Sequence, residues 1–159
     1  MEQAPTSEQE PTKIKSLGDF DLQYFKELEG EDGWLALEQE NCMNQQYFTV
    51  YGSNGEKIGI VGVYDTTDDK NVTHTAVDQK YRGQGLAAKF KQCLMDELNL
   101  PFITLTADLE NTASIRAIEK LPGVKKVSDE KYERDFHKMK FVYEKLQRKS
   151  TEEVNTNIS

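Results

Sequence analysis

The sequence has few residues of the kinds that build disulfide frameworks and metal sites. Its 159 residues include two cysteines and two histidines, and nothing in the chain matches metal-ligand spacing. Of the cysteines, Cys42 and Cys93, the second falls on the apolar face of a predicted helix, where a buried free thiol is expected. These absences argue against a disulfide-stapled scaffold and give no support to a metal-dependent enzyme.

Long hydrophobic runs are missing as well. No apolar stretch approaches the roughly 20 residues that span a bilayer. Residues 1–12 are rich in Glu, Gln and Pro and lack the apolar core of a signal peptide. We therefore expect a cytoplasmic protein without a membrane partner. Residues 1–12 and 148–159 are polar and aperiodic, which predicts two disordered tails around one domain, residues 13–147.

Positive charge is scarce in the first quarter of the chain. The net charge is -8, and residues 1–40 carry eleven acidic and three basic side chains, whereas the remainder is balanced. Nucleic acid is disfavoured as a partner, because binding its phosphates requires a basic face. The acidic segment fits either a rim that attracts a cationic amine or a plain solvated surface.

Residues 80–91 depart from this acidic balance. They contain no acid and four basic side chains, Lys80, Arg82, Lys89 and Lys91. Within them, Gly83 and Gly85 stand where an apolar strand gives way to an amphipathic helix. The free N–H groups and the dipole of a helix N-terminus bind anions, and glycines let a phosphate approach the backbone closely. The pattern predicts a pyrophosphate-binding loop, in which Arg82 and Lys91 either add charge or stay on the solvated surface.

Other glycine-rich loops are weaker matches. Gly83-x-Gly85-x-x-Ala88 fits a loose dinucleotide fingerprint, with Asp108 ending a later strand. Four residues separate the strand end at Val77 from this loop, however, and too few βα units follow. No Gly-Lys-Ser/Thr segment occurs, so a P-loop is excluded. A loop that merely caps its helix is the plain alternative.

One segment resembles the acetyl-CoA loop of the GNAT superfamily of N-acetyltransferases: Arg82-Gly83-Gln84-Gly85-Leu86-Ala87, read as Arg-x-x-Gly-x-Ala. Residues 75–81 are similar to the strand and lead-in that this family places before its loop. The helix that starts at Asn111 is similar to the family's Asn-led helix. The resemblance covers residues 58–121 and extends more weakly to residue 146.

The resemblance implies which residues hold acetyl-CoA. In this family the strand before the loop splays from the strand that follows the loop's helix, and its exposed backbone binds the pantetheine arm. Here that strand segment is Thr75, Ala76 and Val77. Asn111 is implied to contact the cofactor arm and is also a good helix N-cap. The pyrophosphate cradle is formed by Arg82, Gly83, Gln84, Gly85, Leu86 and Ala87.

The expected fold class is α/β (α+β), a single GNAT-like domain with a mixed, mostly antiparallel sheet and helices on both faces. Helices are predicted over residues 21–28, 34–42, 86–98 and 111–121. Strands are predicted over residues 14–17, 46–52, 57–65, 72–77, 102–107, 124–128 and 136–146.

The catalytic groups depart from the family pattern. Many members carry a Glu on the strand before the loop and a Tyr on the helix after the Asn, but the aligned residues here are Asn71-Val72-Thr73-His74 and Ile118. His74 is the nearest titratable group and is the predicted base, with a structural role as the alternative. Tyr64 and Tyr143 are the predicted donors on the thiol side.

Three hypotheses on function follow. The first is an N-acetyltransferase that moves acetyl from acetyl-CoA to a primary amine, of a small molecule or a peptide, in a ternary complex. The second is a CoA-binding regulatory module that has lost catalysis, and the third is a nucleotide-binding protein with a Rossmann-like loop. The acceptor pocket is expected from residues 34–47 and the last two strands. Monomer and homodimer both stay open.

Overall fold

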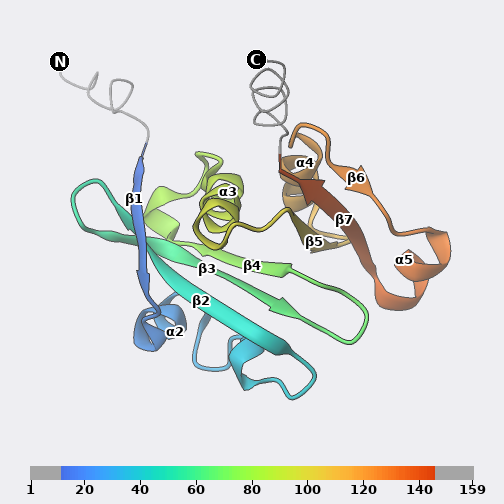
Figure 1. Cartoon of the computed structure of the whole chain (residues 1–159), viewed down its shortest axis with the longest axis horizontal. Helices are drawn as coiled ribbons and strands as arrows, with labels where there is room; N and C mark the ends of the chain where they lie inside the picture. Colours follow the sequence, from blue (N-terminus) through green and yellow to red (C-terminus); the bar gives the residue numbers. More distant parts are fainter. Residues whose placement is uncertain (1–11, 146–159) are drawn as a thin grey trace, which may run out of the picture.

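The computed structural model describes residues 12–145, which form a seven-stranded sheet with helices on both faces (Figure 1). The strand order is β1-β2-β3-β4-β5-β7-β6, and all neighbours are antiparallel except β4 and β5. The predicted fold class is thus confirmed. The strands are β1 (Ile14–Asp19), β2 (Met43–Gly52), β3 (Lys57–Asp65), β4 (Val72–Val77), β5 (Phe102–Asp108), β6 (Lys125–Lys126) and β7 (Lys138–Glu144). The helices are α2 (Leu22–Glu29), α3 (Leu86–Leu98), α4 (Thr112–Glu119) and α5 (Glu130–Phe136), with 3-10 turns η1 (Ala36–Glu38) and η2 (Gln79–Tyr81).

Helices cover both faces of the sheet because successive side chains of a strand point to opposite faces, so each face has apolar side chains to bury. On one face, Phe90 of α3 packs in a cluster with Val61 of β3. On the opposite face, Phe25 of α2 packs in a cluster with Ile60, the neighbouring residue of β3. Helix α4 lies on the same side as α3 and contributes Ile115 to a third cluster with β5 and β7 (Figure 1).

Helix α3 packs against both halves of the sheet, the half formed by β1 to β4 and the half formed by β5, β7 and β6. Its apolar residues Leu86, Phe90 and Leu94 recur every four positions and pack against β2 and β3. Met95, one position further, packs into the cluster of β5 and β7. The helix ends at Asn99, which adopts a left-handed conformation as its C-cap. One helix therefore touches both halves.

The sheet divides between β4 and β5. These strands pair at a single position, Val72 with Thr104, whereas β4 follows β3 over its whole length. Asn71 fastens this junction, because its carbonyl accepts the Thr104 N–H at 2.8 Å and its amide donates to the Phe102 carbonyl at 3.0 Å. Beyond the junction the two strands separate, and the space between them is the site considered below.

The helix predicted over residues 34–42 is wrong. Only η1 forms there, because neighbouring residues Leu35 and Ala36 are both buried while Trp34 and Leu37 are exposed. That burial order does not follow the spacing of an amphipathic helix.

The last predicted strand, residues 136–146, is confirmed as β7 with slightly shorter bounds. The helix before it is not predicted from the sequence: residues Glu130–Phe136 form α5, whose N-cap Asp129 accepts the Tyr132 N–H. The short strand predicted over residues 124–128 shrinks to β6.

Cys93 is partly exposed and not buried as expected, since the buried stripe of α3 runs through Leu94 and Met95. The predicted tails lie outside the described residues, apart from Thr12. None of the helices within residues 12–145 is long and apolar enough to cross a membrane.

Candidate functional site

The loop between β4 and α3 has the backbone geometry of an anion cradle. Gly83 and Gly85 adopt φ angles of 86° and 72°, in the left-handed region that L side chains rarely occupy. Gly85 is the N-cap of α3, no side chain caps the helix, and its first turn contains no acid. The first N–H groups of α3 are therefore available to an anion. This is the geometry expected of a pyrophosphate-binding loop, and the binding itself stays a prediction.

The side chains of the loop serve mainly to hold it. The Arg82 Nε donates to the Val77 carbonyl at 3.0 Å, which ties the loop back to β4. The Gln84 side chain accepts the Thr12 N–H at 2.8 Å. Leu86 is 2% exposed and anchors the first turn of α3 in the core. Binding through this loop would thus depend on backbone donors more than on side chains.

Strand β4 turns part of its backbone toward the gap. The Asp78 N–H donates to the Ile58 carbonyl of β3 at 3.0 Å, and the Ala76 carbonyl lies against Gly59 of the same strand. Because the direction of backbone groups alternates along a strand, Thr75 and Val77 point theirs away from β3. Of the three strand residues implied to bind the pantetheine arm, Ala76 therefore has its backbone groups committed to β3.

A cavity of about 340 Å³ lies where β4 and β5 separate. Thr75 and Lys91 reach it from the face that α3 covers, whereas Trp34 and His74 reach it from the face that α2 covers. The cavity thus runs through the sheet and is lined from both of its faces. The far wall comes from β5, α4 and β7, with Thr106, Ser114, Ile118 and Lys138.

Lys91 places a positive charge inside this cavity. Its Nζ donates to the Thr75 Oγ1 at 3.2 Å, so it does not project into solvent as a surface lysine would. Burial lowers the pKa of Lys91 to about 8, because a charged ammonium is poorly solvated there. No Asp or Glu of residues 12–145 lines the cavity. An anionic ligand is favoured at this end.

Aromatic rings line the other end. The Trp34 ring lies 5.5 Å from both the Tyr64 ring and the His74 ring, measured between centroids. Trp34, the chain's only tryptophan, is 47% exposed, whereas tryptophan side chains in folded proteins are on average highly buried. Burial raises the pKa of Tyr64 to about 12, which keeps its hydroxyl protonated and able to donate. This end suits a ligand with an apolar or planar part.

His74 is held by a second tyrosine. Its Nδ1 lies 2.8 Å from the hydroxyl oxygen of Tyr47, which also accepts the Ala36 N–H at 3.2 Å. Burial first, and the charge of Lys91 second, lower the pKa of His74 to about 4. His74 is therefore neutral at pH 7. Its role as the base stays a prediction, and the low pKa makes it a poor proton acceptor.

The remaining predicted residues lie apart from one another. Asn111 is exposed and accepts the Ser114 N–H at 3.1 Å, which confirms the predicted N-cap, while its contact with a cofactor stays a prediction. Tyr143 is 4% exposed within the cluster of β5, β7 and α4 and does not line the cavity. Tyr143 is therefore not placed to donate to a group in the cavity.

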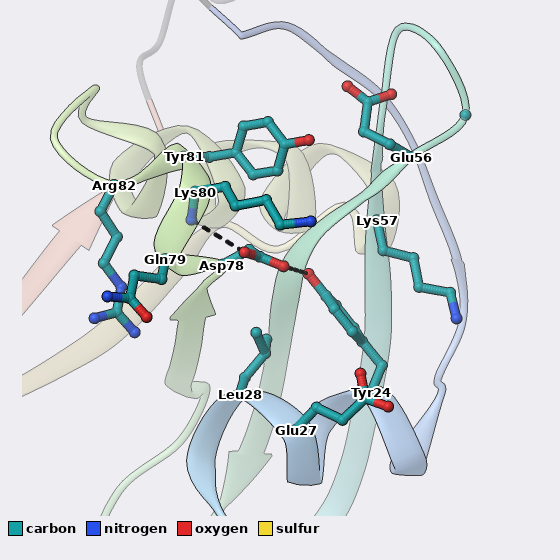
Figure 2. A pocket seen from close by; sticks show the side chains of 11 residues that line it. Tyr24, Glu27, Leu28, Glu56, Lys57, Asp78, Gln79, Lys80, Tyr81 and Arg82 are labelled. Carbon is teal, nitrogen blue, oxygen red and sulfur yellow. Dashed lines mark hydrogen bonds between the residues drawn. The ribbon is translucent and has the colours of Figure 1, made fainter.

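A larger, open cavity of about 620 Å³ adjoins the lead-in to the loop (Figure 2). Figure 2 shows the Asp78 carboxylate between the backbone of Lys80 and the ring of Tyr24. Asp78 accepts from the Tyr24 hydroxyl at 2.8 Å and from the Lys80 N–H at 3.1 Å. The contact fixes η2 against α2, which positions the start of the loop. The lining of this larger cavity mixes acidic and basic side chains, so its charge favours no particular ligand.

The chain matches the family model described as "Acetyltransferase (GNAT) domain" over residues 9–123. It belongs to the GNAT acetyltransferase family. The resemblance found in the sequence is thereby confirmed. No individual curated protein matches the chain significantly in sequence.

Solved GNAT structures share this fold at low sequence identity. A mutant of the spermidine N-acetyltransferase SpeG from Vibrio cholerae aligns with a TM-score of 0.59 and 12% identity, over 81% of this chain and 92% of that one. An acetyltransferase from Agrobacterium tumefaciens strain C58 gives 0.59 and 13%, over 86% and 96%. At these identities the likeness supports the fold and says nothing of the acceptor.

The sequence does not predict several residues that line the cavity between β4 and β5. Lys138 and Thr106 come from β7 and β5, and only the pairing of those strands brings them there. For Lys91 the sequence suggests only added charge at the loop or a place on the surface, yet its position five residues after the start of α3 directs its side chain at Thr75. The exposed Trp34, in a segment expected to form the acceptor pocket, was the most accessible clue.

Proposed function

We propose that this chain is an acetyl-CoA-dependent N-acetyltransferase that transfers acetyl to a primary amine of a small molecule or peptide in a ternary complex. One observation carries the proposal: β4 and β5 pair only at Val72 and Thr104 and then open into a cavity lined by β4 and α3, the two elements that the glycine loop connects. The opening exposes the backbone of Thr75 to an extended amide-bearing ligand.

The charges around the cleft support acetyl-CoA in particular. Its pyrophosphate suits the uncapped start of α3, and its pantetheine arm suits the gap beside Thr75 and Lys91. Acetyl-CoA, when bound, supplies the activated acetyl group. The chain supplies a preformed channel that brings the two reactants together.

The acceptor is proposed to enter from the opposite face, past Trp34 and Tyr64. Acetyl transfer needs a neutral amine nitrogen. The cavity favours that form, because burial and the nearby charge of Lys91 both disfavour an ammonium. Neither cysteine lines the cavity, which supports direct transfer over a thioester formed on the protein.

We expect acetyl-CoA to stabilise the fold. Saturation at 100 times the dissociation constant adds about 2.7 kcal/mol to the free energy of unfolding. Thermal unfolding with millimolar acetyl-CoA should therefore shift upward by several degrees, and NAD should have no effect. A flat response to acetyl-CoA, or a larger rise with NAD, would remove the basis of the proposal.

Replacing Trp34 tests the direction of entry. Trp34→Ala should raise the KM for the amine about 2- to 12-fold, since an aromatic contact contributes about 0.5–1.5 kcal/mol. The Kd for acetyl-CoA should stay unchanged in isothermal titration. Leu37→Ala is the matched control, because Leu37 is similarly exposed in the same segment but lies outside the cavity lining. Equal effects of the two substitutions would place the acceptor elsewhere.

A CoA-binding module without catalysis is the second candidate. It is favoured by Asn71, which uses its polar groups to join β4 to β5 in the region where many family members carry a Glu. Ile118, in place of the family's Tyr, adds an apolar wall to the cavity. Binding of acetyl-CoA without thiol release across a panel of amines would select this candidate.

A further inference from the structure

The contacts of Tyr47 determine where the imidazole of His74 carries its hydrogen. The Tyr47 oxygen accepts the Ala36 N–H at 3.2 Å and lies 2.8 Å from Nδ1 of His74. A phenol has one hydrogen to donate, and Nδ1 is its only acceptor among the described residues. Donation from the hydroxyl to Nδ1 satisfies all these groups at once. Nδ1 is then an acceptor, and the hydrogen of the neutral ring sits on Nε2.

The surroundings keep the ring neutral. The titratable groups around it are Tyr47 of β2, which is hydrogen-bonded to it, and Tyr64, Lys91 and Lys138, which line the same cavity; none of them is a carboxylate that would favour an imidazolium. Phe25 of α2 packs edge-on against the ring at 5.8 Å. Within residues 12–145, Nε2 has no hydrogen-bond partner, and the ring lines the cavity. Nε2–H is thus a free donor at the point where the cavity crosses the sheet.

We propose that His74 donates a hydrogen bond through Nε2–H to the acetyl carbonyl oxygen and does not act as the general base. This role rests on the proposed function. The amine nitrogen bonds to the acetyl carbon, the C–S bond breaks, CoA leaves as the thiolate, and the amine proton passes to water. Negative charge builds on the carbonyl oxygen during this exchange, and a fixed donor stabilises it.

The same geometry argues against a base. To act as a base through Nε2, the ring needs a free lone pair on that nitrogen. In the tautomer that Tyr47 selects, Nε2 carries the hydrogen, and the lone pair on Nδ1 accepts the hydrogen bond from the Tyr47 hydroxyl. To expose a lone pair to the cavity, the ring would have to lose the Tyr47 hydrogen bond. His74 therefore keeps its proton throughout the transfer.

The tautomer is directly measurable without any substrate. The chain has two histidines, and the other, His137, is exposed, so 15N spectra of the variant His137→Gln report on His74 alone. We expect an unprotonated Nδ1 and a protonated Nε2 that do not titrate between about pH 5.5 and 8. Tyr47→Phe should allow the other tautomer to appear. A protonated Nδ1 in the unmodified network would overturn the proposal.

Kinetics separate a donor from a base. Removing a donor to a developing oxyanion costs about 10²–10³ in kcat, and we expect this loss for His74→Ala. His74→Gln restores an N–H but cannot take up a proton, so its kcat should stay within about 10-fold of the parent. Equal losses in the two variants, with both folded, would favour a base, and full activity of His74→Ala would exclude either role.

Acetyl-CoA binding keeps the two proposals distinguishable. Isothermal titration of the His74 variants should give the parent Kd, because Nε2–H acts on the reacting carbonyl and the loop holds the cofactor. If the parent protein does not bind acetyl-CoA, the proposed function fails whatever the tautomer. If it binds and transfers acetyl while Nδ1 carries the hydrogen, only the role of His74 fails.

Discussion

Gly85→Val is expected to lower the affinity for acetyl-CoA by about 100-fold or more, because two hydrogen bonds to a charged group are worth about 3–6 kcal/mol together. The φ angle of 72° at this position is a strong outlier for a β-branched residue, so the backbone must leave the left-handed region. The N–H groups at the start of α3 then no longer converge on one anion. Isothermal titration gives the change in Kd.

The control is a glycine with a similar positive φ angle outside the loop, in the segment after α4. Gly123 has a φ angle of 79°, and an added Cβ would meet nothing within 4 Å, as at Gly85. Gly123→Val should therefore cost similar stability while leaving the affinity for acetyl-CoA intact. A folded Gly85→Val protein with the parent Kd would mean that the loop only caps its helix.

Phe90→Ala is expected to destabilise the fold by about 3–5 kcal/mol, the usual cost of emptying a buried aromatic site. Phe90 is 0% exposed, and its ring fills the space that a side chain at Gly59 would need. Since net stabilities are about 5–15 kcal/mol, the loss takes a large share of the total. Urea denaturation followed by circular dichroism measures it.

The neighbouring position supplies the comparison. Lys89 is exposed on the same helix, so Lys89→Ala should change the free energy of unfolding by no more than about 0.5 kcal/mol. A Phe90→Ala protein as stable as the Lys89→Ala protein would show that α3 is not held to β3 by this contact.

The sequence predicts well those elements whose signals are local. Apolar alternation marks β3 and β4, and the four-residue spacing of Leu86, Phe90 and Leu94 marks α3. Asn54-Gly55 predicts the hairpin between β2 and β3 with positive φ angles at the turn; the hairpin forms, and Gly55 has a φ angle of 81°, but Asn54 does not adopt a positive φ. The glycine loop is equally local, because the conformation of each residue depends on its own backbone.

Elements defined by distant partners are harder to predict. The segment Glu130–Phe136 has few apolar residues, and its helix α5 is held by the Asp129 cap and by contacts with β7. In the site, Lys138 and Trp34 reach one cavity from elements a hundred residues apart, which no short motif records. The tautomer of His74 depends on Tyr47, 27 positions earlier, so no spacing rule contains it.

The divided sheet also bears on association with other chains. A strand with unpaired N–H and C=O groups ordinarily invites another strand to pair with it, which makes exposed sheet edges prone to aggregation. Here β4 carries such an edge in the middle of the sheet, beside β5 and beneath α3. A strand of a folded neighbour has less access to this edge than to one at the border of a sheet, whereas the proposed ligand, with its extended amide-bearing arm, is slender enough to reach it. The fold thus places unpaired backbone groups where they are open to a small ligand and shielded from edge-to-edge association.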